Sequence, residues 1–194
     1  MIAPAAITLG VLAGGRGARF GGADKAWLDD HGEPSLARCL AQFDDPFANG
    51  FAARLVSARA ADARHAALGV TPVLDRAPGF RGPVAALAAL AHACTTPWLL
   101  TVPVDTRDLP ASLPERLAGA GGREGACLVD ADGLQPLLAL WPAAALAAVA
   151  DAALADDDAS ARQVVDALGL ARVVIAPARL RNLNTPADLA ASTR

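Results

Sequence analysis

The chain has 194 residues, which is enough for a hydrophobic core of useful size, and we expect one domain spanning residues 1–194. Hydrophobic residues make up 54% of the chain, but many of them are alanine, and aromatic residues account for only 4%. The net charge of -3 argues against a broad surface for nucleic acid or for an anionic membrane. Any anion that the protein binds must therefore be held by a local site.

The amino-terminal segment and the cysteines predict a soluble cytoplasmic protein. The apolar stretch that begins at Met1 lacks the basic region of a signal peptide and runs directly into a glycine-rich loop. No stretch reaches the roughly 18 uninterrupted apolar residues that a membrane-spanning helix needs. Cys39, Cys94 and Cys127 are far apart and odd in number, so we expect small buried side chains in a reducing compartment.

The first half of the chain alternates short apolar runs with alanine-rich segments of helical character. Strands are predicted over Ile7–Leu12, Arg54–Ala58, Thr71–Asp75 and Trp98–Asp105. Their unbroken apolar character is typical of strands buried on both faces of a parallel sheet. Helices are predicted over Ser35–Phe43, Ala60–Leu68 and Pro83–Cys94. This alternation predicts an α/β fold, a Rossmann-like three-layer sandwich with a mostly parallel sheet.

The second half is less regular. The runs GACLVD and QPLLALW flank the turn sequence ADG, which predicts two strands joined by a turn. A helix is expected over Ala143–Leu154. The acidic run Asp156–Asp158 then fits a solvated loop or a helix N-terminus better than a metal site. A last strand is predicted over Ala171–Ala176, and Thr185 before Pro186 is typical of a helix N-cap.

A glycine-rich loop, Leu12–Lys25, follows the first predicted strand, at the position where α/β sheets bind phosphates. Glycine lets backbone N–H groups approach phosphate oxygens closely. Two common phosphate-loop patterns fail here. The dinucleotide fingerprint requires glycine where Phe20 stands, and this disfavours a dehydrogenase. A nucleotide-hydrolase loop over Gly17–Gly22 requires lysine and then serine or threonine where Ala23 and Asp24 stand.

A third pattern fits the loop. The glycines with Arg16, Arg19 and Lys25 resemble the signature loop of nucleotidyltransferases, and most closely that of the molybdenum cofactor guanylyltransferase family. The segments LDRAPGFRGPVAAL, VPVDT, QPLLALW and NLNTPADL resemble further motifs of that family, in the same order and over essentially the whole chain. The resemblance implies transfer of GMP from GTP to the terminal phosphate of molybdopterin, with release of pyrophosphate.

Lys25 is the only lysine of the chain. A solvated surface charge is the ordinary interpretation of a lysine, but here every other basic residue is arginine, so a geometric requirement is favoured. A compact ammonium group can meet crowded phosphate oxygens as a point charge where a planar guanidinium would not fit. Asp105 follows a buried strand, and its carboxylate suits Mg²⁺; capping of the next helix is its alternative role.

The resemblance also implies where substrates bind. The expected catalytic residues are Arg19, Lys25 and Asp105, with Asp105 as the ligand of Mg²⁺. Arg16 and Arg19 would stabilise the departing pyrophosphate, and pairing with surface carboxylates is the alternative for both. The nucleotide is expected at Leu12, Ala13, Gly14, Gly15, Arg16, Gly22, Lys25, Ser57, Asp75 and Asp105. The pterin substrate or product is expected at Gly82, Arg162, Asn182 and Asn184.

Several positions bear on specificity. Gly14 favours guanine, because the related cytidylyltransferases usually carry alanine there and a methyl group would narrow the space beside the base. Ser57 stands where the family commonly has asparagine, and Ala86 where glycine is frequent. Arg107 and Asp108 add charges after Asp105. These departures leave the phosphate machinery intact and bear mainly on the acceptor.

The expected partners are GTP and molybdopterin, with transient contact to molybdoenzymes or their chaperones, and neither nucleic acid nor membrane. A cytidylyltransferase for the same cofactor and a sugar-phosphate nucleotidyltransferase are alternatives within the superfamily. A nucleotide-binding partner of molybdoenzymes without catalytic activity is an alternative outside it.

Overall fold

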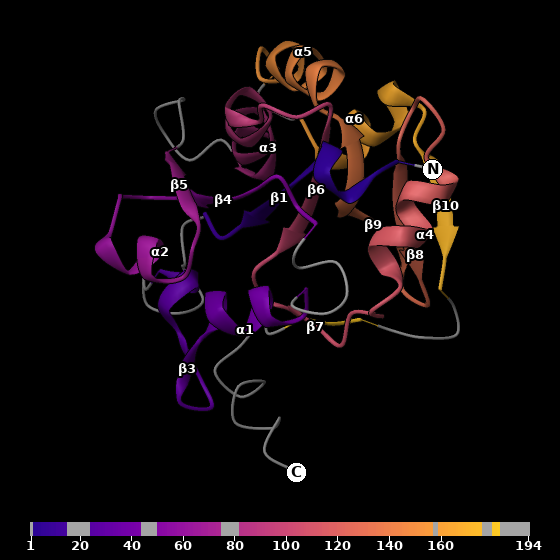
Figure 1. Cartoon of the computed structure of the whole chain (residues 1–194). Helices are drawn as coiled ribbons and strands as arrows, with labels where there is room; N and C mark the ends of the chain where they lie inside the picture. The colour runs from indigo at the N-terminus through magenta and orange to yellow at the C-terminus, as the bar shows by residue number, and fades with distance from the viewer. Residues whose placement is uncertain are drawn as a thin grey trace.

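The computed structural model describes residues 2–14, 24–43, 50–74, 82–156, 159–175 and 180–182. Their centre is a seven-stranded sheet in the order β10-β8-β9-β6-β1-β4-β5 (Figure 1). Only β9 runs antiparallel to its neighbours β6 and β8, so the other strands of the sheet end at one common edge. The strands are β1 Ile7–Leu12, β4 Ala53–Ala58, β5 Thr71–Leu74, β6 Trp98–Pro103, β8 Ala126–Asp130, β9 Gly133–Pro142 and β10 Ala171–Val174.

Helices cover both faces of this sheet. They are η1 Pro4–Ala6, η3 Lys25–Trp27, α1 Ser35–Ala41, α2 Ala63–Ala67, α3 Gly82–Ala93, α4 Leu113–Ala120, α5 Ala143–Ala153 and α6 Ala161–Leu168. Two short antiparallel pairs lie outside the main sheet: β2 Asp29–Asp30 with β3 Glu33–Pro34, and β7 Thr106–Arg107 with β11 Arg181–Asn182. Within the described ranges, no helix combines the length and the apolar character that crossing a membrane requires.

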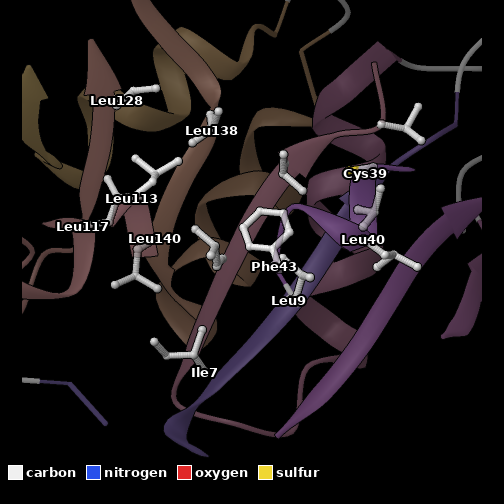
Figure 2. Close-up of a cluster of buried hydrophobic side chains, with 14 of the residues drawn as sticks. Ile7, Leu9, Cys39, Leu40, Phe43, Leu113, Leu117, Leu128, Leu138 and Leu140 are labelled. Carbon is white, nitrogen blue, oxygen red and sulfur yellow. The ribbon is translucent and has the colours of Figure 1, made fainter. Parts of the chain in front are cut away.

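Side chains that alternate along the strands build two cores. Leu100 and Val102 of β6 pack toward α1 and α4, whereas Leu99 packs toward α3, α5 and α6. Figure 2 shows the first core, where side chains of β1, α1, α4, β8 and β9 meet. The second core contains the fully buried Trp141, whose indole N–H donates to the hydroxyl of Thr101 at 2.8 Å. These layers confirm the predicted α/β sandwich with a mostly parallel sheet.

The sequence located most elements but misplaced some of their ends. The β8–β9 hairpin forms as predicted, and β1 is buried along its whole length. By contrast, β5 is an edge strand, so its residues are only partly covered. Strand β6 ends at Pro103, which places Asp105 in a turn instead of in the strand. Helix α2 begins at Ala63, because the side chain of Asp62 caps it there.

Two α-helices, α4 and α6, and the short 3-10 helices η1 and η3 were not predicted. In α4, Leu113 and Leu117 stand one helical turn apart and are both buried, and Pro114 lies in the first turn. In α6, Ser160 and Gln163 form a capping box, which is a start signal that the sequence carries. The predicted helix start at Thr185 lies outside the described residues.

All three cysteines are free thiols, but Cys94 is only partly buried, so the expected burial holds for two of them. Cys39 and Cys127 are buried, and burial raises the pKa of each thiol to about 12. Both therefore remain protonated near neutral pH and act as small hydrophobic side chains.

Glycine is required at the start of β8. Gly125 has a φ of +86°, and a Cβ atom built there would overlap the carbonyl oxygen of Leu140. We expect Gly125→Ala to lower the free energy of unfolding by about 2–4 kcal/mol, because strain and overlap add. Gly119→Ala is the matched control, since Gly119 lies in α4 with no atom within 4 Å of the added methyl group. The control should be neutral or stabilising by up to about 1 kcal/mol. Urea unfolding measures both, and equal effects would contradict this account.

Candidate active site

The site lies where β1 and β6 end side by side. Leu12 pairs with Pro103 at the ends of these two strands, and the Val104 N–H donates to the Leu12 carbonyl at 3.0 Å. The chain leaves β1 toward the glycine-rich loop and leaves β6 toward Asp105. A parallel sheet therefore brings the loop and the carboxylate to one edge, as the sequence predicted.

Lys25 and Asp105 form an ion pair at this edge. The Nζ of Lys25 donates to Oδ2 of Asp105 at 2.8 Å, and the two side chains are 30% and 18% exposed. The structure thus brings together two of the three predicted catalytic residues from positions 80 residues apart in the chain. The alternative role of Asp105 as a helix cap is wrong, because β7 follows it and the next helix begins only at Leu113.

The segment that carries Lys25 is well anchored. It forms the short helix η3, and the side chain of Asp24 caps this helix by accepting the Ala26 N–H at 3.0 Å. Ala26 is buried in the core on the α1 face, and the Trp27 ring packs on His65 with 4.9 Å between ring centroids. These contacts fix the backbone of Lys25 against the core, while its side chain remains partly exposed.

Ser57 supports the beginning of the glycine-rich loop. Ser57 lies near the end of β4, and its side chain is fully buried. Its Oγ accepts the N–H groups of Ala13 and Gly14, each at 3.1 Å. A Cβ atom at Gly14 would lie 3.3 Å from that Oγ. A methyl group there would thus press on the Ser57 hydroxyl, and the preference of Gly14 for guanine stays a prediction. Direct contact between Ser57 and a nucleotide stays a prediction.

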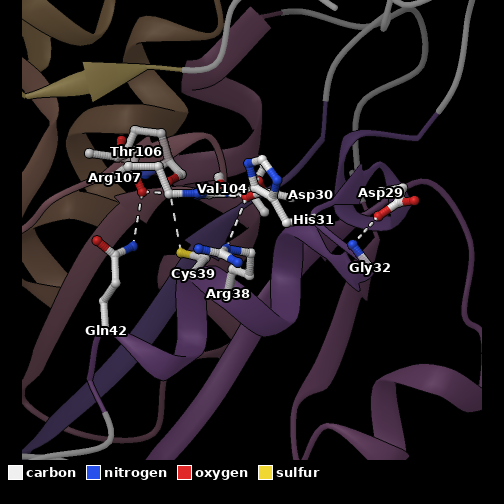
Figure 3. A network of polar contacts seen from close by, with 11 residues as sticks. Asp29, Asp30, His31, Gly32, Arg38, Cys39, Gln42, Val104, Thr106 and Arg107 are labelled. Atoms are coloured by element: carbon white, nitrogen blue, oxygen red, sulfur yellow. Dashed lines mark hydrogen bonds and ion pairs between the residues drawn. The ribbon is translucent and has the colours of Figure 1, made fainter. Parts of the chain in front are cut away.

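The turn around Asp105 is held by polar side chains from the α1 layer (Figure 3). Gln42 donates to the Thr106 carbonyl at 2.9 Å and accepts the Leu109 N–H at 3.1 Å. Arg107 is only 11% exposed and points at the buried carboxylate of Asp30. The sequence had suggested that Arg107 bears on the acceptor, but its charge is directed into the protein.

Asp130 anchors the carboxy-terminal segment beside the same turn. Its carboxylate accepts the N–H groups of Leu180 at 3.0 Å and Asp132 at 2.9 Å, and the amide of Gln135 at 2.9 Å. Burial alone would raise the pKa of Asp130, but these donors outweigh it and hold the pKa below its usual range. This anchor lets β11 pair with β7, so that Asn182 lies opposite Thr106, next to Asp105.

A cavity of about 200 Å³ opens beside Asp105. Its polar lining comes from Asp105, Thr106 and Gln135, and its remaining walls are apolar. The cavity is lined by Pro103, Asp105, Thr106, Gln135, Pro136, Leu137, Leu138 and Leu180. A polar edge facing an apolar wall suits a molecule with a charged group and a ring system.

Other predicted residues are not brought to the ion pair. Gly82 begins α3 with a φ of +72° and is exposed. Arg162 is exposed in the first turn of α6, in the helical layer opposite to α1. Ala86 is buried within α3 and packs in the second core. Six predicted site residues lie outside the described residues: Gly15, Arg16, Arg19, Gly22, Asp75 and Asn184.

The donors near Asp105 fit one kind of metal ion. In the part of the chain that the structure describes, no three His, Cys, Asp or Glu side chains are grouped as metal ligands. A single carboxylate next to an ammonium group is too sparse a set for zinc or for a calcium cage. It suits Mg²⁺, which keeps several waters and takes one or two carboxylates together with substrate phosphates.

Comparison with known proteins identifies the family of the chain. Residues 9–173 match the family model described as the MobA-like NTP transferase domain. The chain belongs to this family. A molybdenum cofactor guanylyltransferase from Cupriavidus necator is 38% identical over 154 residues, covering 75% of each chain. One from Ralstonia nicotianae is 36% identical over 164 residues, covering 81% of this chain and 76% of the relative.

Solved structures of members and neighbours of this family share the fold. Molybdopterin-guanine dinucleotide biosynthesis protein A from Archaeoglobus fulgidus superposes with a TM-score of 0.71 at 20% identity, covering 95% of this chain and 96% of that one. A 2-C-methyl-D-erythritol 4-phosphate cytidylyltransferase from Thermus thermophilus gives 0.63 at 18% identity, covering 94% and 95%. The common architecture confirms the α/β sandwich.

The support that Ser57 gives to the loop can be tested by nucleotide binding. We expect Ser57→Ala to weaken GTP binding about 5- to 30-fold, because two backbone N–H groups lose their acceptor. Thr8→Val is the matched control: it removes a buried hydroxyl that bonds Thr96 at the opposite end of the sheet, near the start of β1. Calorimetric titration with GTP measures both variants. Unchanged affinity in Ser57→Ala would show that the loop keeps its shape without this side chain.

The lowered pKa of Asp130 gives a pH-dependent prediction. A carboxyl group whose pKa is lower in the folded state stabilises the fold above its unfolded-state pKa, and this stabilisation is lost as pH falls through the folded-state pKa. We expect Asp130→Asn to lower the free energy of unfolding by about 1–3 kcal/mol near neutral pH, and the deficit to shrink below about pH 4. Urea unfolding over a pH series measures it.

Asp166→Asn is the control for Asp130→Asn. Asp166 is 55% exposed and pairs with Arg172 at the surface, so its replacement should change stability little. A deficit of Asp130→Asn that grows toward low pH would contradict the assigned hydrogen bonds.

Proposed function

We propose that this chain transfers GMP from GTP to the terminal phosphate of molybdopterin, which yields molybdopterin guanine dinucleotide and pyrophosphate. Membership of the MobA-like NTP transferase family and the names of the relatives that cover three quarters of the chain support this reaction. We further propose that one nucleotidyltransferase domain carries it out in the cytoplasm, in transient contact with molybdoenzymes or their chaperones.

The ion pair of Lys25 with Asp105 carries the proposal, because it places a cation and an anion beside the glycine-rich loop. A nucleoside triphosphate brings several negative charges to this loop, and its magnesium ion brings two positive ones. Lys25 then has phosphate oxygens to neutralise, and Asp105 has a cation to hold. Until the substrate arrives, the two side chains neutralise each other, so neither partly buried charge is left uncompensated.

Asp105 is the residue that would hold Mg²⁺, in line with the sparse oxygen donors around it. When bound, the ion supplies positive charge to the oxygens of the α-phosphate and of the departing pyrophosphate. Arg16 and Arg19 are proposed to add positive charge on the pyrophosphate side. The backbone of Leu12, Ala13 and Gly14, fixed by Ser57, is proposed to hold the base and ribose.

The attacking group is a phosphate oxygen of the acceptor, and it is anionic near neutral pH. The reaction therefore needs no side chain to remove a proton from the nucleophile, and the protein contributes position and charge. We place the acceptor in the cavity beside Asp105, where Gln135 is held by Asp130 and Asn182 lies on the neighbouring strand. The apolar walls would receive the pterin rings.

Product analysis tests this function. The purified protein is incubated with molybdopterin, Mg²⁺ and GTP, CTP, ATP or UTP in separate reactions, and products are identified by mass. We expect the mass of the guanine dinucleotide and release of pyrophosphate with GTP only. A product with CTP only would indicate a cytidylyltransferase. A product from a sugar phosphate but not from molybdopterin would overturn the acceptor.

Variants of the ion pair test its role in the same assay. Lys25→Ala and Asp105→Asn should each lower kcat about 100- to 1,000-fold, because each removes a charge aligned with the transferred phosphate. Lys25→Arg should also be impaired, since a guanidinium group is broader than an ammonium group. Arg172→Gln is the control: it removes an exposed arginine of β10, an edge strand of the sheet, and its kcat should match that of the unaltered protein. Normal turnover by Lys25→Ala would contradict the assignment.

A further inference from the structure

We propose that Arg107 is a positioning residue that holds Asp105 in place for metal binding by clamping its turn to the segment that carries Lys25. This inference rests on the proposed function, because it concerns the same phosphate and metal site. It assigns to Arg107 a role in the reaction although its side chain is directed into a buried polar network (Figure 3).

One end of the clamp is the turn itself. Nη1 of Arg107 donates to the carbonyl oxygens of Val104 at 2.8 Å and Thr106 at 3.0 Å. These two carbonyls belong to the residues on either side of Asp105. A single guanidinium nitrogen therefore fixes the backbone before and after the carboxylate, and with it the direction in which the carboxylate leaves the turn.

The other end of the clamp is Asp30. Nε and Nη2 of Arg107 both donate to Oδ2 of Asp30, at 2.9 and 2.6 Å. Asp30 is only 2% exposed and lies in β2, directly after the segment that begins with η3 and Lys25. Arg107 thus connects the two segments behind the ion pair, independently of the direct contact between Lys25 and Asp105.

The chemistry of the network requires arginine at position 107. A planar guanidinium group can direct one nitrogen at the two carbonyls while its other nitrogens reach the carboxylate, whereas an ammonium group is a single point charge. Arg38 and His31 also face Asp30, with Nε of Arg38 at 3.4 Å and Nε2 of His31 at 3.7 Å. In this network, neither Arg38 nor His31 donates a hydrogen bond to the turn of Asp105. The charge beside Asp30 and the positioning of the turn can therefore be tested separately.

The clamp matters most when the substrate is bound. The ammonium of Lys25 then turns to phosphate oxygens, and its direct bond to Asp105 at 2.8 Å is given up. Asp105 would be free to change direction at the moment when it must hold the metal ion. The bonds of Arg107 do not involve Lys25 or Asp105 side chains, so they persist through this exchange.

The experiment compares Arg107→Lys and Arg107→Met with Arg38→Met. Mn²⁺ serves as the metal probe, and free Mn²⁺ is measured by electron paramagnetic resonance in the presence of α,β-methylene-GTP, which cannot transfer GMP. Arg38→Met is the matched control, because it removes another arginine from Asp30 without removing a bond to the turn. Arg107→Lys keeps the positive charge beside Asp30, so we expect it to fold even if Arg107→Met does not.

We expect Arg107→Lys and Arg107→Met to raise the Mn²⁺ dissociation constant about tenfold or more and to lower kcat, with Arg38→Met close to the unaltered protein in both. A purely structural role would reduce the amount of folded protein and leave the Mn²⁺ affinity of the folded fraction unchanged. The metal titration thus separates positioning from stability.

Arg107→Lys with unaltered Mn²⁺ affinity would overturn the proposal, and so would an equal loss in Arg38→Met. The titration uses no acceptor, so its result does not depend on the proposed reaction. If the unaltered protein forms no product with molybdopterin, the proposed function fails while the titration still decides the role of Arg107. If Asp105→Asn binds Mn²⁺ as tightly as the unaltered protein, Asp105 is not the ligand and the clamp has no metal to serve.

Discussion

The contact between the Lys25 ammonium and the Asp105 carboxylate joins two segments that leave the sheet from adjacent parallel strands. A partly exposed ion pair of this kind contributes little to stability, on the order of 1 kcal/mol or less. Its importance lies in the strand order and the supporting side chains that place the two charges together. The strand order positions β1 beside β6, and this order brings Lys25 and a carboxylate distant in the sequence to one edge, where we propose that phosphates bind.

Buried polar groups surround the pair and hold its backbone. Ser57 accepts two N–H groups of the loop, and Asp130 attaches the carboxy-terminal segment. Asp30 with Arg107 connects the segments of Lys25 and Asp105. The side chains of Ser57, Asp130 and Asp30 each accept at least two hydrogen bonds, and these bonds offset the cost of burying their oxygens. The two charged groups that would meet substrate can thus stay accessible while their supports are rigid.

Much of the fold was predictable from the sequence, because strands such as β1 are apolar without interruption and helices such as α3 are marked by Pro83 near their start. Lys25 and Asp105 were also predictable, from the single lysine and from the strand that precedes the carboxylate. The buried contacts that support the ion pair were not predictable. Nothing local in the sequence links Asp30 to Arg107, since their contact spans 77 positions and depends on how α1 packs on the sheet. The sequence shows Arg107 only as an added charge after Asp105 that bears on the acceptor, whereas the structure pairs it with the buried Asp30.

The most direct test of the central claim is a crystal structure with α,β-methylene-GTP and Mn²⁺, whose anomalous scattering locates the metal. We expect the metal about 2.0–2.2 Å from a carboxylate oxygen of Asp105, with the Lys25 ammonium moved onto phosphate oxygens. A metal bound elsewhere, with the nucleotide in place and the bond between Lys25 and Asp105 still closed, would contradict the account.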